Sequence, residues 1–364
     1  MQTINRRGGL QGFREAVKGK KVTIGFIGGS ITEAANENNW PEFIRGWFVQ
    51  KFPQKRLYME NAALGGTSSF CGLMRADRDL ISQGCDLVFV EYAVNDPMSL
   101  SDFHRRTREG LVRKLLKSGT DVVIVYTYCQ NMYRAMQKGE VPQSVAEFEL
   151  LAEHYGVSSV WMGKYAYDAV KSGRISWEGW LPISGGSLHP DYAGSMLYAE
   201  PVIALLEEEL SKEPVQLLRK GKDVPAPYDP ENYENMKEIP ESALELDGPW
   251  VFMREVFSPW YRRVLYTAAD GASLKFRFKG RVLGAMCNFG KRCALFETRI
   301  DGGAWTPVTG EREYWVPDKN WTAPILFADG LGAGEHTFEM RIRHGDGENY
   351  KGTECKIYAF YSAE

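Results

Sequence analysis

The sequence predicts an α/β domain with a parallel sheet, followed by a second domain built of β-strands. From residue 20 to about 212, short apolar runs alternate with helix-like stretches, which is the pattern of strands covered by helices on both faces. After residue 246, short alternating runs recur between turn sequences, and no helix-period stretch competes with them. The chain of 364 residues is also longer than one hydrophobic core usually serves, so we expect two domains.

The strands of the expected parallel sheet are apolar runs that end at glycine or polar residues. The first is Lys21–Ile27, which stops at a pair of glycines. Further strands are expected at Arg56–Ala62, Asp86–Ala93, Asp121–Tyr128 and Val157–Met162. The helix-like stretches are Trp40–Phe52, Phe70–Gln83, Leu100–Lys117, Val145–Tyr155 and Asp191–Ser211. In such sheets ligands bind beyond the carboxyl ends of the strands, so the segments that follow the strands are where we look for a site.

Residues 213–245 differ in composition from the segments on either side. Five prolines interrupt any long helix there, at Pro214, Pro225, Pro227, Pro230 and Pro240, and the stretch is interpreted as a linker that crosses the surface. Beyond it, expected strands include Ser273–Phe278, Ala294–Ile300 and Thr337–Ile342. A jelly-roll-like β-sandwich suits a segment of this length. The predicted organisation is therefore an α/β domain over 1–212, a linker over 213–245 and a β-sandwich over 246–364.

Composition and charge exclude several classes of function. The formal net charge is −3, from 44 basic and 47 acidic residues. The chain therefore lacks the excess of basic residues that is typical of proteins that bind nucleic acid or an anionic membrane. The apolar runs are too short to span a bilayer. Six scattered cysteines and five isolated histidines show no metal-ligand spacing, so we expect no metal and no cofactor. No apolar run follows Arg6 and Arg7, so a cytoplasmic location is expected unless a secreted chain has been trimmed.

Four short motifs carry residues suited to acyl-transfer chemistry. Ser30 follows the first strand on a glycine-bounded turn, and paired glycines ending at Gly66 follow the second. Asn95 follows the third strand, where its amide can donate a hydrogen bond to an oxyanion. His189 precedes the last helix and can act as a general base to a serine. Each motif alone has an ordinary explanation as a turn, an Asx turn, a cap or a structural histidine.

The order of these four residues along the chain resembles the SGNH (GDSL-like) hydrolase family, which is named for them. Gly29-Ser30 is similar to the family's Gly-Asp-Ser block, with glycine in place of the aspartate. Ala93–Asp96 resembles its Gly-x-Asn-Asp block, and His189 with the following proline resembles its final His-Pro. The resemblance covers about residues 20–212. It implies a flavodoxin-like parallel sheet flanked by helices, and a serine esterase that needs no cofactor.

The resemblance also implies a role for each of the four residues. Ser30 is the expected nucleophile and His189 its base. The backbone N–H groups of Ser30 and Gly66, together with the side chain of Asn95, are expected to form the oxyanion hole. Gly66 aligns best with the oxyanion-hole glycine, and Gly65 stands one position away.

One departure from the family pattern concerns the acid that orients the histidine. Family members usually have an aspartate three residues before it, and here that position is Gly186. A backbone carbonyl that accepts the Nδ1 proton would leave a Ser–His dyad. Glu178, on the preceding loop, is a second alternative. Asp191 is a third, although at that position it better suits an N-cap of the last helix.

The substrate is the least determined part of the sequence-based prediction. We expect short acyl groups, especially O-acetyl groups on sugars, because no long apolar segment suggests an acyl channel and the β-sandwich resembles modules found with carbohydrate esterases. Trp177 and Trp180 lie near His189 in sequence and could either stack on a sugar or pack an irregular loop. The alternatives are a longer-chain lipase or thioesterase, and an inactive carbohydrate-binding protein. The expected partner is a small-molecule or glycan ester, and the oligomeric state stays open.

Overall fold

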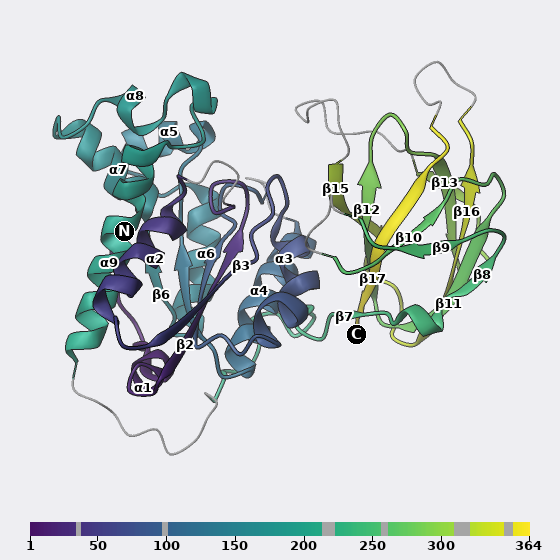
Figure 1. Ribbon diagram of the computed structural model, residues 1–364, viewed down its shortest axis with the longest axis horizontal. Coiled ribbons are helices and arrows are strands. Elements are labelled where there is room, and N and C mark those ends of the chain that lie inside the picture. Colours follow the sequence, from purple (N-terminus) through teal and green to yellow (C-terminus); the bar gives the residue numbers. More distant parts are fainter. Residues whose placement is uncertain (34–37, 97–100, 213–222, 256–260, 309–320, 346–351) are drawn as a thin grey trace. The chain divides into compact units, whose positions relative to one another are not determined.

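The computed structural model describes residues 1–33, 38–96, 101–212, 223–255, 261–308, 321–345 and 352–364. The chain divides into two compact units, Met1–Glu234 and Asn235–Glu364. Figure 1 shows helices around a sheet in the first unit and strands in the second. The predicted fold class, an α/β region followed by an all-β region, is therefore confirmed.

The sheet of the first unit has the strand order β1-β6-β5-β4-β2-β3. Its strands are β1 (Ile4–Asn5), β2 (Lys21–Gly28), β3 (Arg56–Asn61), β4 (Leu87–Glu91), β5 (Asp121–Val125) and β6 (Ser158–Val160). The pairs among β2 to β6 are parallel, and only the short β1 runs antiparallel to its neighbour. Counted in chain order, the five parallel strands lie as 2-1-3-4-5, which is the flavodoxin-like arrangement. The strand order reverses between β2 and β4, so a ligand is expected beyond their carboxyl ends.

Helices cover this sheet in two groups (Figure 1). The longer helices are α1 (Gln11–Ala16), α2 (Trp40–Lys51), α3 (Ser69–Ala76), α4 (Asp102–Lys117), α6 (Gln143–His154), α7 (Met162–Lys171) and α9 (Tyr192–Ser211). Helix α9 packs against α2 and α7, and α4 packs against α3 and α6. Every residue of β4 and β5 is buried, as expected for strands covered on both faces. The sequence analysis did not anticipate α7, and a π-helical turn, Asp77–Ile81, follows α3 within the single helix expected there.

Short helical segments form the loops at the carboxyl end of the sheet. They are η2 (Gln130–Met132), α5 (Tyr133–Gln137), α8 (Trp177–Trp180) and η3 (Ile183–Gly185). The last two lead directly to His189, and α9 begins three residues after it. The chain between α7 and α9 therefore carries the histidine on an arm of tight turns rather than on a regular element.

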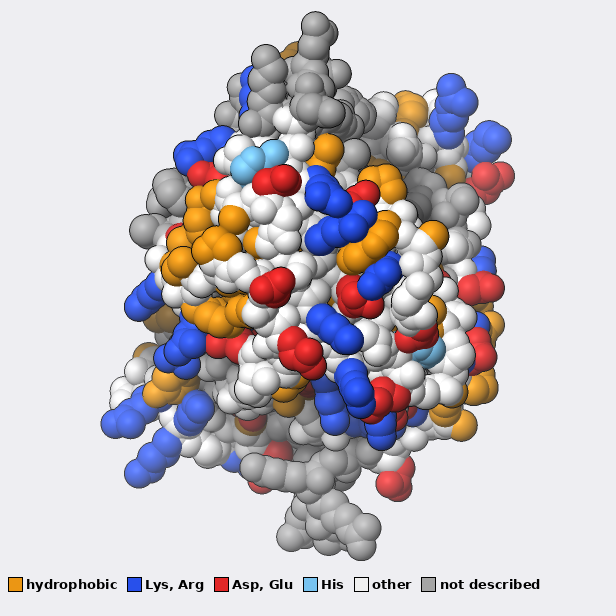
Figure 2. Space-filling view, turned by 90° about the vertical axis from the view of Figure 1, so that its right-hand side faces the viewer, with side chains coloured by type: hydrophobic (Ala, Val, Ile, Leu, Met, Phe, Trp, Pro, Cys, Tyr) orange, Lys and Arg blue, Asp and Glu red, His pale blue; other side chains and the backbone are white. Residues whose placement is uncertain are grey.

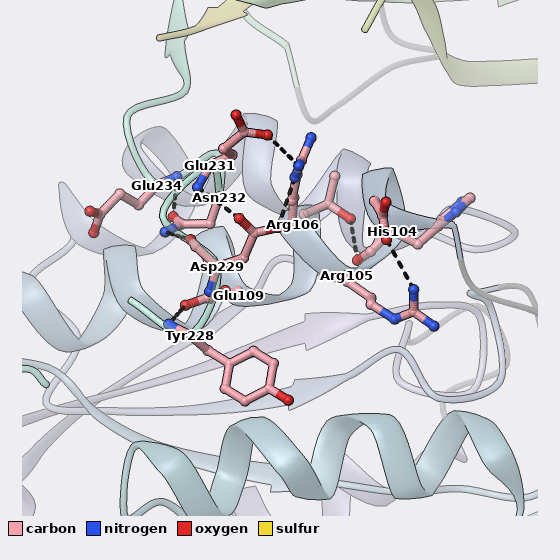
Figure 3. A network of polar contacts seen from close by, with 11 residues as sticks. His104, Arg105, Arg106, Glu109, Tyr228, Asp229, Glu231, Asn232 and Glu234 are labelled. Atoms are coloured by element: carbon pink, nitrogen blue, oxygen red, sulfur yellow. Dashed lines mark hydrogen bonds and ion pairs between the residues drawn. The ribbon is translucent and has the colours of Figure 1, made fainter. Parts of the chain in front are cut away.

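The described part of the expected linker is divided between the two units. Residues 223–234 belong to the first unit, where the buried carboxylate of Glu109 on α4 accepts the N–H groups of Tyr228 and Asp229 at 2.6 and 2.8 Å. Arg106, also on α4, pairs with Asp229 at 2.8 Å (Figure 3). A Cβ at Gly110 would lie 2.8 Å from the carbonyl carbon of Tyr233, so the glycine permits this close approach. From Asn235 onward the chain belongs to the second unit.

The described strands of the second unit form two antiparallel sheets. One has the order β15-β12-β17-β10-β9, with β7 paired to β17, and the other has the order β14-β13-β16-β11-β8. The strands are β7 (Lys237–Glu238), β8 (Glu245–Asp247), β9 (Val251–Met253), β10 (Val264–Thr267), β11 (Ser273–Lys279), β12 (Val282–Phe289), β13 (Leu295–Ile300), β14 (Thr306–Val308), β15 (Trp321–Ala328), β16 (Glu335–Arg343) and β17 (Cys355–Ala363).

Alternation along the strands explains how these two sheets share one core. On β11, Leu274, Phe276 and Phe278 are buried while the residues between them are exposed or half-buried. Phe276 packs against Phe338 of its own sheet at a centroid distance of 5.1 Å, and against Phe360 of the other sheet at 4.8 Å.

The second sheet of this unit also carries cross-strand ion pairs. They join Arg299 to Glu339 at 2.7 Å, Arg341 to Glu297 at 2.6 Å and Arg277 to Glu335 at 3.4 Å. On the side of the molecule in Figure 2, basic and acidic side chains are interspersed over the described surface. Such mixed charge forms no single-sign patch on that side.

Candidate active site

Ser30 lies on a tight turn directly after β2, at the carboxyl end of the sheet. The N–H groups of Thr32 and Glu33 donate to the carbonyl oxygen of Gly29 at 3.1 and 2.9 Å, which closes the turn. A Cβ at Gly28 would lie 2.7 Å from the carbonyl oxygen of Glu91, so only glycine fits the close approach of β2 to β4. The hydroxyl of Ser30 is thus placed at the reversal of strand order, where this sheet is expected to bind a ligand.

His189 is brought to Ser30 by the arm that follows η3. Gly186 and Ser187 adopt left-handed backbone conformations, with φ of 67° and 52°, and so reverse the chain. The Nε2 atom of His189 lies 2.7 Å from the Oγ of Ser30. Its Nδ1 atom lies 3.2 Å from the carbonyl oxygen of Gly185. A proton on Nδ1 that is donated to this carbonyl leaves the lone pair of Nε2 directed at the serine hydroxyl, which is the tautomer a general base needs.

The two carboxylates considered as a third catalytic member lie elsewhere. Asp191 accepts the N–H of Ala193 at 3.1 Å and caps α9, as its position in the sequence suggested. Glu178 is exposed on α8, and no described contact joins it to His189. Of the three alternatives from the sequence, the backbone carbonyl of Gly185 is the one found on Nδ1.

The glycine loop after β3 lies against Ser30. A Cβ added to Gly65 would be 3.2 Å from the Cβ of Ser30 and 2.5 Å from a carboxylate oxygen of Glu33. The N–H of Gly65 donates to that carboxylate at 3.0 Å, so it is already occupied. Gly66 adopts a left-handed conformation with φ of 67°. Among the described residues, no acceptor lies on the N–H of Gly66 or of Ser30.

Asn95 packs directly on the turn that carries Ser30. A Cβ added to Gly29 would lie 1.9 Å from its Oδ1 atom and 2.7 Å from its Nδ2 atom, so the amide occupies the space a side chain would need. Oδ1 is buried and has no hydrogen-bond partner within the described residues. The neighbouring Asp96 has a different environment: it accepts the N–H of Ser69 at 2.8 Å and pairs with the buried Arg108 at 2.6 Å.

The structure brings in one residue that the sequence analysis did not single out. Glu91, the last residue of β4, is fully buried beneath the turn of Ser30. Its carboxylate accepts hydrogen bonds from the hydroxyls of Thr32 at 3.1 Å and Thr127 at 2.8 Å. Burial raises the pKa of this carboxyl to about 7, although the hydrogen bonds that it accepts act in the opposite direction. A glutamate at the end of an apolar strand was the signal available in the sequence.

The expectation that Trp180 forms part of a sugar-stacking platform is wrong. Trp180 is 0% exposed, with its ring 4.9 Å from that of Tyr128 and 6.2 Å from that of Tyr198. Trp177 is half-buried and packs edge-on against Tyr128 and Tyr133 at 5.7 and 5.6 Å. The second explanation in the sequence analysis, packing of an irregular loop, therefore holds for Trp180.

The described residues were also compared with the requirements of a metal site and of a membrane-spanning helix. Within the described residues, no group of three or more His, Cys, Asp or Glu side chains could hold a metal ion. None of the helices that the structure describes is long and apolar enough to cross a membrane.

Comparison with known proteins supports the fold of the whole chain. The sequence matches no protein-family profile and no curated protein. Among solved structures, it is similar to a two-domain esterase (CEX) active on acetylated mannans, with 24% identity and a TM-score of 0.81 over 100% of this chain and 97% of that chain. A structure of such an esterase with mannopentaose gives 23% identity and a TM-score of 0.80 over the same shares. This likeness confirms that the chain has a two-domain fold, with an α/β unit followed by an all-β unit.

Proposed function

We propose that the chain is a serine esterase that removes short acyl groups, in particular O-acetyl groups, from carbohydrate. The single observation that carries this proposal is the 2.7 Å contact between the Oγ of Ser30 and the Nε2 of His189. It lies at the carboxyl end of a parallel sheet, beside two N–H groups that have no acceptor among the described residues. Nucleophile, base and oxyanion donors are therefore available in one place.

In the proposed reaction His189 removes the proton of Ser30 while the serine oxygen attacks the ester carbonyl. The negative charge that develops on the carbonyl oxygen is held by the N–H groups of Ser30 and Gly66 and by the amide of Asn95. His189 then protonates the leaving sugar hydroxyl as the C–O bond of the ester breaks, which leaves an acyl group on Ser30. Water, deprotonated by the same histidine, attacks this acyl group, and the carboxylic acid leaves as the proton returns to the serine.

The carbonyl of Gly185 replaces the usual acid in this account. A neutral acceptor fixes the ring and its tautomer, but it stabilises the imidazolium less than a carboxylate does. The proposed enzyme is therefore a Ser–His dyad supported by its oxyanion hole. Such an arrangement lowers the rate without changing the sequence of steps.

Two observations support acetyl groups on carbohydrate as the substrate class. The solved structures similar along the whole chain are an esterase active on acetylated mannans, alone and with mannopentaose. The chain also shares their second, all-β unit, because the similarity covers 100% of its length.

The experiment that tests the proposal measures acetate released from acetylated mannan and acetylated xylan, alongside p-nitrophenyl esters of increasing chain length. We expect the protein to release acetate from the glycans and to hydrolyse the two-carbon p-nitrophenyl ester fastest. Both activities should be lost in Ser30→Ala. Ser184→Ala is the matched control, because Ser184 is exposed on the same arm as His189 and its side chain makes no hydrogen bond within the described residues. A maximum at eight carbons or more would favour a lipase or thioesterase. Binding of the glycans without any turnover would favour a carbohydrate-binding protein.

A further inference from the structure

The carboxylate of Glu91 is hydrogen-bonded to the turn that carries Ser30. It accepts the hydroxyl of Thr32, two residues after Ser30, at 3.1 Å, and the backbone N–H of Gly29, the residue before Ser30, also favours its charged form. A second hydrogen bond, from Thr127 at 2.8 Å, ties the carboxylate to the loop after β5. Glu91 is 0% exposed, so no water competes for these contacts.

Thr32 connects this carboxylate to the surrounding elements. Its hydroxyl accepts the indole N–H of Trp40 at 3.1 Å and donates to Glu91. Its carbonyl oxygen accepts the side-chain amides of Asn39 at 2.6 Å and Asn61 at 2.9 Å. Because β3, β4 and the start of α2 all contribute to this network, the position of the turn is set by tertiary contacts.

We propose that Glu91 is a positioning residue for the nucleophile: by fixing Thr32, and through it the turn, it directs the hydroxyl of Ser30 toward His189. This inference rests on the proposed function of Ser30 and His189. Glu91 lies beneath the turn and acts through it rather than on the substrate. The two hydroxyl donors that converge on this carboxyl group match the ionised form, which accepts hydrogen bonds and donates none.

The protonation state of Glu91 then governs the turn. The pKa of this carboxyl is raised to about 7 by burial. The other titratable groups around it are Asp96, which is ion-paired to Arg108, and Tyr92, Cys129 and Tyr198, whose own pKa values are raised mainly by burial and which are therefore neutral. As the pH falls through this range, Glu91 takes up a proton. It then becomes a donor, and one of the hydrogen bonds that it accepts is lost.

The pH dependence of kcat/KM on p-nitrophenyl acetate tests this assignment. Protonation of Glu91 should add one unit to the slope of the acid limb of log kcat/KM in wild type. In Glu91→Gln, which keeps the size of the side chain without its titration, the slope should therefore be one unit lower than in wild type, with kcat/KM at pH 8 about tenfold lower. An unchanged slope and an unchanged kcat/KM in Glu91→Gln would overturn the proposal.

A second variant keeps the test decisive if Glu91→Gln does not fold. Thr127→Val removes a donor to the carboxylate that is not part of the turn of Ser30, so the pKa of Glu91 and the steep part of the acid limb should move to higher pH. An acid limb that falls over the same pH range in Thr127→Val as in wild type would contradict the assignment.

Two controls separate this proposal from the proposed function. Asp121→Asn replaces another buried carboxylate, at the start of β5, which accepts the N–H of Phe13 at 2.8 Å, and it should retain the wild-type slope. If Ser30→Ala keeps full activity, the proposed function itself fails. If Ser30→Ala is inactive while Glu91→Gln behaves as wild type, only the role of Glu91 fails.

Discussion

The carbonyl oxygen of Gly185 accepts two hydrogen bonds from His189, one from the backbone N–H at 3.1 Å and one from the ring Nδ1 at 3.2 Å. The histidine is thus oriented by a turn in its own neighbourhood, which includes the left-handed residues Gly186 and Ser187. This contact makes an acidic third member unnecessary for holding the ring toward Ser30.

The first prediction is that neither candidate carboxylate matters for turnover. A carboxylate that orients the catalytic histidine contributes about 10⁴-fold to kcat. We expect Glu178→Gln and Asp191→Asn to keep kcat for p-nitrophenyl acetate close to wild type, because Glu178 lacks a described contact with His189 and asparagine also caps helices well. A loss of about a thousandfold or more in either variant would identify the acid and contradict the dyad.

The second prediction concerns Gly29, the residue before the proposed nucleophile. A Cβ there would lie 1.9 Å from Asn95, so Gly29→Ala must displace either the amide or the turn. We expect a loss of activity of about a hundredfold or more, comparable to the loss of an oxyanion donor. Gly46→Ala is the matched control, because a Cβ at Gly46 on α2 meets nothing within 4 Å. Equal activity in the two variants would show that the packing of Asn95 on Gly29 has no catalytic role.

The third prediction tests the oxyanion hole itself. Asn95→Ala removes a donor used only when charge develops on the substrate, so kcat should fall by about 100- to 1000-fold while KM changes little. Asn131→Ala, at an exposed position on η2, provides the control for an asparagine outside the site. An increase in KM with unchanged kcat would instead assign Asn95 to binding of the ground state.

The fourth prediction follows from the raised pKa of Glu91 and is independent of activity. The folded state holds this proton up to about pH 7, whereas an unfolded glutamate releases it near its ordinary pKa of 4.5. The free energy of unfolding should therefore fall as the pH rises between these values, by on the order of 3 kcal/mol from this group alone.

Glu91→Gln lacks this titration. The difference in the midpoint of thermal unfolding, variant minus wild type, should therefore increase as the pH rises from 5 to 8. Thermal unfolding of both proteins across this range measures the difference. A difference that is constant with pH would place the pKa of Glu91 near its ordinary value.

The fifth prediction concerns the segment that ends the first unit. Glu109 accepts the N–H groups of Tyr228 and Asp229 (Figure 3), and its removal takes this acceptor from both, although the N–H of Tyr228 keeps the hydroxyl of Tyr155 at 3.2 Å. We expect Glu109→Ala to destabilise the first unit by roughly 1–3 kcal/mol, the cost of breaking a buried hydrogen bond from one side. Turnover at 25 °C should be unchanged, because Glu109 makes no described contact with Ser30, Asn95 or His189. Denaturant unfolding checks the first expectation, and a drop in kcat without loss of stability would contradict the second.

Much of the fold could be predicted because its signals are local. Apolar runs such as Lys21–Ile27 and the alternation along Ser273–Phe278 specify strands in their own right, and both segments form strands. The contact of Ser30 with His189 has no such local signal: the pairing was expected from the order of the four motifs along the chain, and His189 reaches Ser30 from the arm after η3.

The remaining features depend on contacts between distant segments, which no local pattern encodes. A backbone carbonyl was one of three alternatives, and only the path of the chain after η3 identifies it as the carbonyl of Gly185. Trp180 was misjudged because its burial against Tyr128 and Tyr198 joins residues far apart in sequence. Glu91 was overlooked because its partner Thr127 lies 36 residues further along the chain.

The most direct test of the account is hydrolysis of p-nitrophenyl acetate by wild type, Ser30→Ala and His189→Ala measured side by side. The account predicts that wild type turns the ester over and that both variants fall by about 10³-fold or more, since the two residues act as one unit. Two results would contradict the assignment of these residues as nucleophile and base. One is wild-type activity that Ser30→Ala retains, and the other is a folded wild-type protein that does not hydrolyse the ester.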